Sequence, residues 1–107
     1  MNVVLVNSFF YPEALTCGPV VQTLDAARVL SRAHAVSVFS GTLEPAQAPG
    51  SLALTRVEGI PVARYRPLPA AGMMSRYRVL SDRHLERLFR EYLRQVSADI
   101  VHCNVIH

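Results

Sequence analysis

The sequence predicts an α/β fold in which a mainly parallel sheet carries helices on both faces. Residues 3–6 form an apolar run without polar alternation, which is typical of a strand covered on both faces. An amphipathic helix is expected at 20–32, and a second run rich in β-branched and aromatic residues spans 35–40. This strand–helix–strand order over residues 3–40 predicts two parallel strands joined by a right-handed crossover.

The first helix is predicted to start just after Gly18 and Pro19. Proline is tolerated at the first helical position, and glycine lets the backbone approach a ligand closely. A helix N-terminus at the carboxyl end of a parallel strand is a favourable site for an anion such as a diphosphate. The core-facing stripe of this helix is expected to contain Val20, Leu24, Ala27 and Leu30.

Two short strands are expected next, at 52–57 and 60–65, joined by the two-residue turn Glu58-Gly59. Residues 41–50, which precede them, contain glycines and prolines and are expected to form a surface loop. Because Pro61 cannot donate a hydrogen bond to a neighbouring strand, the second strand is expected either to begin there or to lie at a sheet edge.

The last third of the chain predicts a helix and a further strand. Residues 73–97 are expected to be helical, in two pieces that meet near 81–82, and 98–103 is expected to form another buried strand. The chain stops directly after this strand, which predicts a cut rather than a natural end. The apolar stripe of the second helical piece consists of Leu85, Leu88, Phe89, Tyr92, Leu93 and Val96.

Composition narrows the function classes. A chain of 107 residues suits one small domain, and all eleven of its basic residues are arginines, six of which lie within 76–94. This cluster predicts a solvated helix face, or a face for a membrane surface or a phosphate-rich ligand. Nucleic acid is not expected, because the cluster lacks interleaved aromatic residues and a reader motif. Two cysteines, no membrane-length apolar run and no signal peptide predict a cytoplasmic protein.

Ligands of open α/β sheets bind outside the carboxyl ends of the strands, where the strand order reverses. If the strand at 3–6 is central, with the strand at 35–40 on one side and that at 100–103 on the other, the loop 7–18 and the segment 102–107 flank this crevice. The sequence has neither a dinucleotide fingerprint nor a phosphate-binding loop. His102 is either a core histidine or a ligand contact, and Asn104 and His107 lie further out. A zinc site is not expected, because the spacing of the cysteines and histidines is wrong. Nor is a Cys17 nucleophile paired with His102, because nothing supplies an oxyanion hole.

Five segments carry a family resemblance. In their order and spacing the chain resembles the amino-terminal domain of family 4 glycosyltransferases of the GT-B fold, over nearly its whole length. The segments are Met-Asn-Val-Val-Leu-Val-Asn-Ser-Phe-Phe-Tyr-Pro-Glu (1–13), Leu-Asp-Ala-Ala-Arg-Val-Leu (24–30), His-Ala-Val-Ser-Val-Phe (34–39), Glu-Gly-Ile-Pro-Val (58–62) and Ala-Asp-Ile-Val-His (98–102).

The resemblance implies that residues 1–107 are part of a Rossmann-like three-layer sandwich, the acceptor-side domain of a two-domain enzyme. By the same resemblance, the donor-binding carboxy-terminal domain is expected to be absent from this chain. The enzyme would be a retaining, hexosyltransferase-like glycosyltransferase that needs no metal or cofactor. It would transfer a sugar from a nucleotide-diphosphate sugar to a glycan, a lipid-linked acceptor or a small molecule. The fragment alone is expected to be inactive.

The resemblance also implies roles for individual residues. Gly18 matches the second glycine of the loop near the donor diphosphate, and Cys17 stands where relatives have the first glycine. His102 matches the first histidine of the family's D-[IV]-[IV]-H-x-H strand end, while Asn104 falls on the second. Since asparagine cannot carry a proton charge, His107 is an alternative for part of that role. The acceptor side is represented by Phe10, Tyr11 and Glu13.

Two further expectations concern partners. Many relatives act on lipid-linked acceptors, so the arginine-rich helix 73–97, with Met73, Met74 and Tyr77, is expected to contact the inner face of a membrane peripherally. The alternative to an enzyme is a free-standing α/β module without catalysis, which recognises a phosphorylated small molecule or a partner chain at the same crevice.

Overall fold

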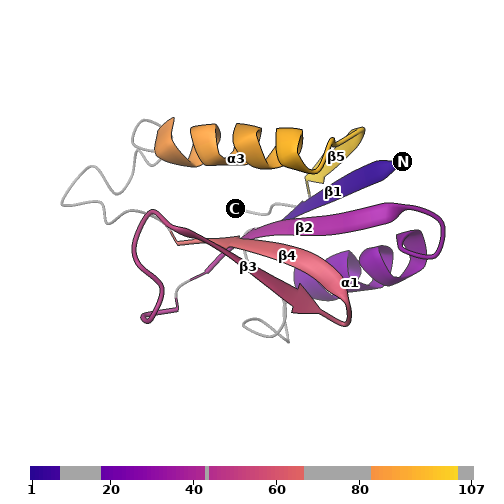
Figure 1. The fold of residues 1–107 in the computed structure, drawn as a ribbon. Helices are drawn as coiled ribbons and strands as arrows, with labels where there is room; N and C mark the ends of the chain where they lie inside the picture. The colour runs from indigo at the N-terminus through magenta and orange to yellow at the C-terminus, as the bar shows by residue number, and fades with distance from the viewer. Residues whose placement is uncertain (8–17, 43, 67–82, 104–107) are drawn as a thin grey trace.

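The structure, a computed structural model, describes residues 1–7, 18–42, 44–66 and 83–103. They form a five-stranded sheet in the order β3-β4-β2-β1-β5 (Figure 1). Strand β1 (Asn2–Asn7) pairs in parallel with β2 (Ala35–Gly41) on one side and with β5 (Ile100–Cys103) on the other. The predicted α/β fold with a mainly parallel sheet is therefore confirmed. Strand β1 lies between β2 and β5, which is the arrangement on which the expected crevice depends.

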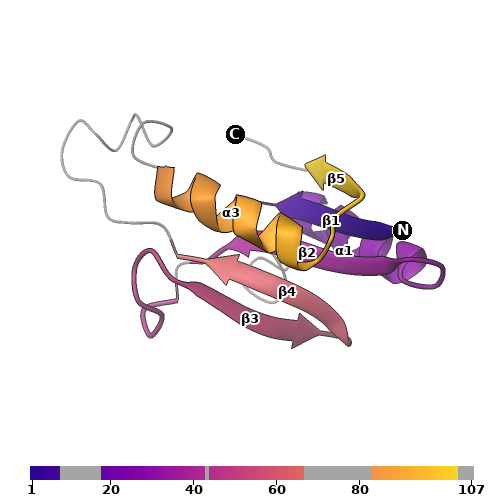
Figure 2. The same ribbon diagram turned by 45° about the horizontal axis from the view of Figure 1, so that its top comes forward.

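The two described helices lie on opposite faces of the sheet, as Figures 1 and 2 show from two directions. Helix α1 (Gly18–Leu30) begins two residues earlier than predicted, at Gly18 itself. Its Leu24 and Ala27 are buried together with Leu5 and Val38 of the sheet, which confirms the expected apolar stripe at these positions.

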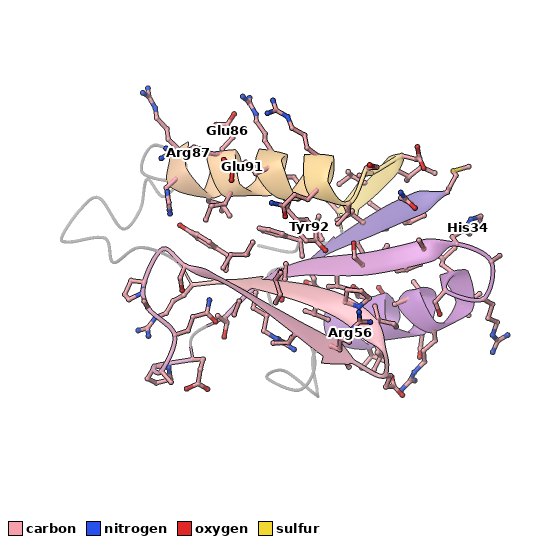
Figure 3. All side chains as sticks on the ribbon, viewed as in Figure 1. His34, Arg56, Glu86, Arg87, Glu91 and Tyr92 are labelled. Atoms are coloured by element: carbon pink, nitrogen blue, oxygen red, sulfur yellow. The ribbon has the colours of Figure 1, made fainter. Side chains whose placement is uncertain are left out.

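Helix α3 (Arg83–Gln95) covers the other face through aromatic contacts. The Phe39 ring lies 4.8 Å from the Phe89 ring and 5.5 Å from the Tyr92 ring, measured between centroids. Figure 3 shows Tyr92 pointing from the helix towards the sheet. Tyr92 is buried in this core, and the other members of the apolar stripe predicted from Leu85 to Val96 are half-buried and pack against it, so the predicted helix face is confirmed. The earlier part of the predicted helix, 73–82, lies outside the described residues.

Strands β3 (Leu52–Val57) and β4 (Ile60–Tyr65) form the predicted antiparallel hairpin. Its two turn residues both have positive φ, 52° at Glu58 and 79° at Gly59. Positive φ at both central positions defines a type I′ turn, whose twist matches that of the flanking strands. Glycine adopts this backbone conformation freely, whereas Glu58 adopts it against its intrinsic preference.

The edge alternative for Pro61 is wrong, because β4 lies inside the sheet between β3 and β2. The strand begins at Ile60, one residue before the proline. Ile60 and Val57 close the turn as a hydrogen-bonded pair, so the amide position of Pro61 faces β2. Pairing between β4 and β2 begins only at Val62, and no donor is therefore needed at Pro61.

The predicted burial of the last strand is also wrong. All four residues of β5 are exposed, including Ile100 and Val101. Among the described residues β5 pairs only with β1, at one edge of the sheet. The two core clusters, in which the helices pack on the sheet, contain no residue of β5, so this strand lacks the helices' cover. The apolar residues therefore predicted the strand correctly, but they did not predict that its side chains are exposed.

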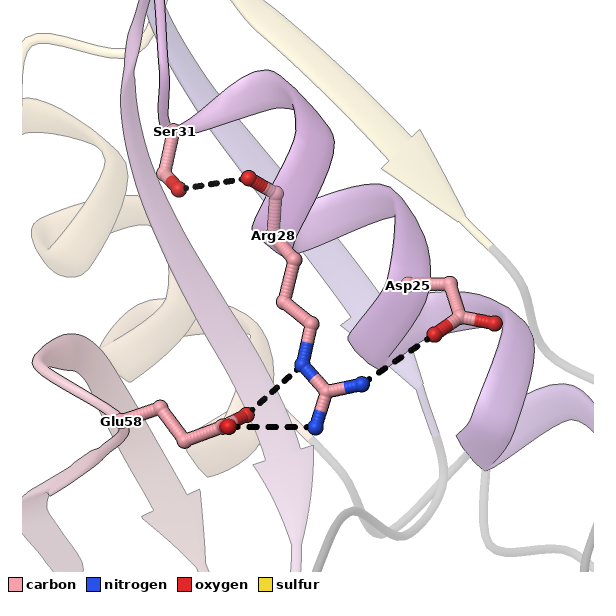
Figure 4. A network of polar contacts seen from close by, with 4 residues as sticks. All are labelled: Asp25, Arg28, Ser31 and Glu58. Carbon is pink, nitrogen blue, oxygen red and sulfur yellow. Dashed lines mark hydrogen bonds and ion pairs between the residues drawn. The ribbon is translucent and has the colours of Figure 1, made fainter.

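An ion-pair network ties α1 to the hairpin turn (Figure 4). Arg28 donates from Nε to Glu58 Oε2 at 2.9 Å and from Nη2 to Glu58 Oε1 at 3.1 Å, and its Nη1 lies 3.4 Å from Asp25 Oδ1. The hydrogen bond that the Arg28 guanidinium donates to Glu58 is the main cause that raises the pKa of Arg28. Because these side chains are about half exposed, salt should screen the network strongly.

Replacing Glu58 separates the turn from the ion pair. Asparagine tolerates positive φ, so Glu58→Asn should relieve about 1 kcal/mol of backbone strain. The lost ion pair opposes this gain at low salt and hardly at all in about 0.5 M NaCl. We expect the urea midpoint of Glu58→Asn to exceed that of the wild type, and by more at high salt. Glu58→Gln is the control: it should be less stable than the wild type at low salt only. A gain for Glu58→Asn that does not depend on salt would contradict this account.

Burial raises the pKa of the Tyr92 phenol above its ordinary value of 10.0, and a hydrogen bond with Ser37 lowers it in part. In the unfolded chain the phenol ionises near pH 10, while the folded chain keeps it protonated to higher pH. The free energy of unfolding should therefore be flat below about pH 10 and fall from there towards the folded pKa. Urea titrations of the wild type and Tyr92→Phe from about pH 8 to pH 11 test this. The fall should be smaller in Tyr92→Phe, and equal falls would rule out Tyr92 as its source.

Candidate functional site

A row of polar side chains crosses the carboxyl edge of three neighbouring strands. In the register of the sheet, Asn7 of β1 lies beside Ser40 of β2, and Ser40 lies beside Arg64 of β4. The row one step earlier is entirely apolar and consists of Leu5, Val38 and Val62. We call Asn7, Ser40 and Arg64 the polar row.

The polar row faces α1. Side chains two residues apart on a strand share a face, and the apolar row before it packs with Leu24 and Ala27 of α1. All three polar residues are buried: the exposed fractions are 5% for Asn7, 1% for Ser40 and 8% for Arg64. Buried polar groups cost free energy unless they are hydrogen-bonded, so a row of them at one edge marks a place for polar contacts.

Helix α1 contributes to the same edge. Its hydrogen bond to the row runs from Asn7 Nδ2 to Thr23 Oγ1 at 3.1 Å, and Thr23 is itself buried. The helix begins at Gly18, so its N-terminal amides lie on the carboxyl side of β1. The N-terminus of a helix carries a partial positive charge that favours anions. The Arg64 guanidinium adds a full positive charge on the same side of the sheet.

Within the polar row, the Ser40 hydroxyl makes no hydrogen bond to a described residue. Its Oγ is fully buried and has no hydrogen-bond partner among the residues that the structure describes. Thr42 follows at the same edge, where its amide donates to Tyr65 O at 2.9 Å and its Oγ1 accepts from the Glu44 amide at 3.1 Å. A hydroxyl, an amide and a guanidinium can together hold hydroxyl or phosphate oxygens.

The structure tests only part of the predicted site. Gly18 begins α1 at the expected edge, and His102 lies in β5 beside Leu5, one row before the polar row. His102 is exposed, so the alternative of a core histidine is wrong. The other predicted site residues lie outside the described residues, and their roles stay predictions: Phe10, Tyr11, Glu13, Cys17, Asn104 and His107.

The ligands for a metal do not come together in the described part of the chain. Among residues 1–7, 18–42, 44–66 and 83–103, no group of three or more His, Cys, Asp or Glu side chains could hold a metal ion. Cys103 is an exposed free thiol at the end of β5. No described helix is long and apolar enough to cross a membrane.

The arginines of α3 lie on its outer side. Arg83, Arg87, Arg90 and Arg94 are all exposed, and Arg90 pairs with Glu86 as the spacing predicts. This confirms a solvated basic helix face. Contact of that face with a membrane stays a prediction, since the apolar residues invoked for it, Met73, Met74 and Tyr77, lie outside the described residues.

The sequence analysis missed Ser40 and Arg64, although a signal for them exists. Three strands share one alternating pattern in which two apolar residues are followed by a polar one at the same spacing. The triplets are Val3-Leu5-Asn7, Val36-Val38-Ser40 and Ile60-Val62-Arg64. Each pattern alone looks like the end of a strand, and only the register shows that the three polar residues are neighbours.

Comparisons with models of known protein families, with curated proteins and with solved structures found no match.

Replacing Ser40 tests whether its buried hydroxyl destabilises the folded state. An unsatisfied buried hydroxyl is unfavourable, so Ser40→Ala should raise the free energy of unfolding by about 1 kcal/mol. Ser37→Ala, also in β2, is the matched control, because Ser37 is buried but shares a hydrogen bond with Tyr92. We expect Ser37→Ala to be destabilised in the same urea titration. Equal destabilisation of the two variants would show that Ser40 has a structural partner.

Proposed function

We propose that this chain is the acceptor-side amino-terminal domain of a retaining glycosyltransferase of the GT-B fold, in which the sheet, α1 and α3 form a Rossmann-like three-layer sandwich. The observation that carries the proposal is the polar row beside the start of α1. Its Asn7 end lies next to the boundary between β1 and β5, where the strand order reverses. Ligands of open α/β sheets bind outside the carboxyl ends of strands at such a reversal.

The chemistry of each site residue suggests which part of the substrates it would bind. The N-terminal amides of α1, entered through Cys17 and Gly18, would approach the diphosphate of a nucleotide-sugar supplied by a second domain. The Ser40 hydroxyl and the Asn7 amide suit the hydroxyl groups of a sugar or an acceptor, and Arg64 suits an anionic group. His102, Asn104 and His107 would contact the reacting sugar from the end of β5. The reaction needs no metal in this scheme.

The test is sugar transfer by the polypeptide that the source gene encodes, including whatever follows residue 107. Nucleotide-diphosphate sugars with different bases are incubated with sugar, lipid-linked and small-molecule acceptors, and release of the nucleotide is measured. Retention is checked from the anomeric configuration of the product by NMR. Ser40→Ala should lower kcat/KM by about ten-fold or more, because a hydrogen bond to a charged or reacting group contributes about 1.5–3 kcal/mol. If Ser40→Ala has a higher free energy of unfolding but a lower kcat/KM than the wild type, the Ser40 hydroxyl serves activity and not folding.

Ser31→Ala is the control, since Ser31 is exposed at the end of α1 and its hydroxyl donates to Arg28 O. It should leave kcat/KM unchanged. Failure of every donor to release nucleotide would contradict the glycosyltransferase proposal. If the 107-residue chain then still bound a phosphorylated small molecule, with Ser40→Ala weakening the binding, the non-catalytic binding module would be the better account.

A further inference from the structure

Strand β3 is an open edge of the sheet that residues 1–7, 18–42, 44–66 and 83–103 form. It pairs with β4 on one side, and no described element pairs with it on the other (Figure 2). Pairing runs one-to-one from Leu52 opposite Tyr65 to Val57 opposite Ile60, so the strand has no bulge. A six-residue edge strand without bulge or proline presents a row of backbone groups that another strand can pair with.

The hairpin turn decides which backbone groups are presented. Val57 and Ile60 form the hydrogen-bonded pair next to the turn, and such pairs alternate along an antiparallel ladder. The N–H and C=O groups of Val57, Thr55 and Ala53 therefore face β4. Those of Leu52, Leu54 and Arg56 face outwards from the open edge.

The side chains of the edge add an apolar anchor. Leu54 is 71% exposed on the face that α3 covers elsewhere in the sheet. The helix stops short of the hairpin and leaves a groove of about 550 Å³ that is bordered by Leu54, Arg56 and Tyr92. Natural edge strands are usually protected by charge, and the single charge of this strand is Arg56.

We propose that β3 pairs in antiparallel fashion with β3 of a second copy of this chain, around a two-fold axis at Leu54, so that two sheets join into one. Leu54 then faces Leu54 of the second copy, and Leu52 faces Arg56 of the second copy on either side of the axis. This register places every outward N–H and C=O opposite an outward partner, and each of these pairs exchanges two hydrogen bonds. A register shifted by two residues would place Leu54 opposite Arg56 and use fewer of these groups.

The strand is self-complementary in charge as well as in register. Arg56 faces a leucine, which its aliphatic stem can cover, and no like charges face each other. The two Arg56 residues are four positions apart along the strands, about 14 Å, which exceeds the Debye length of about 10 Å in 0.1 M salt. Strand pairing alone buries less than the roughly 1,000 Å² of a stable interface, so the dimer should be weak and reversible.

Sedimentation of the 107-residue chain over a range from about 10 μM to 1 mM should show a concentration-dependent dimer. Leu54→Lys places two lysines opposite each other at the axis and should weaken the dimer by about ten-fold or more. The matched control is Val29→Lys, which puts the same charge at another exposed apolar position, on α1, and should leave the dimer unchanged. Circular dichroism checks that both variants are folded.

A mixing experiment tests the register. Leu54→Glu alone should also be monomeric, whereas an equimolar mixture of Leu54→Lys and Leu54→Glu should recover the dimer. In a background with Cys17→Ser and Cys103→Ser, Leu54→Cys should form an intermolecular disulfide, because hydrogen-bonded antiparallel pairs have Cα atoms about 5.5 Å apart. Thr55→Cys should not, since the two copies of that position are offset by two residues.

Four outcomes would overturn the proposal. If the chain stays monomeric at the highest concentration, β3 does not pair with a second copy. Its edge would then be available to a strand of another protein. Equal weakening by Leu54→Lys and Val29→Lys would indicate general hydrophobic association instead of strand pairing. Failure of the charge mixture to recover the dimer, or crosslinking at Thr55→Cys in preference to Leu54→Cys, would exclude the two-fold axis at Leu54.

Discussion

The structure depends on the burial of β1 from all sides. Val4 packs under α3 with Phe39, and Leu5 packs under α1 with Val38, while both edges of the strand are paired. Full burial of side chains of this size contributes roughly 1.5–3 kcal/mol each, so no other arrangement of these residues competes easily. Once β1 is central, the crossover through α1 fixes β2 on one side, and β5 takes the other.

The same strands change from apolar to polar at one row, and that change gives the molecule its candidate site. Leu5, Val38 and Val62 close the core, and the next residues on the same face are Asn7, Ser40 and Arg64. Asn7 is accommodated by its hydrogen bond to Thr23 of α1. The Ser40 hydroxyl is buried without a partner among the described residues. Such a group does not stabilise the fold, and a functional role is one explanation for it.

The two ends of the sheet differ in their protection. At one end β5 is a short strand whose four side chains are all exposed, so the sheet gains little burial there. At the other end β3 is longer, regular and nearly uncharged, and its hairpin is held to α1 by the bond between Arg28 and Glu58. A rigid, well-paired hairpin presents its outer backbone groups in a fixed geometry, which is the condition for pairing with another strand.

The sequence by itself determined the elements whose signals are local. The apolar run of β1, the stripe of α3 and the turn at Glu58 and Gly59 need only neighbouring residues, and the structure has all of them. Only the tertiary structure decided which strands are neighbours and how they are aligned. It placed β4 inside the sheet despite Pro61, left β5 exposed despite its apolar residues, and brought Ser40 beside Asn7 and Arg64. Register and cover depend on contacts between residues far apart in the chain, and no local pattern encodes those contacts.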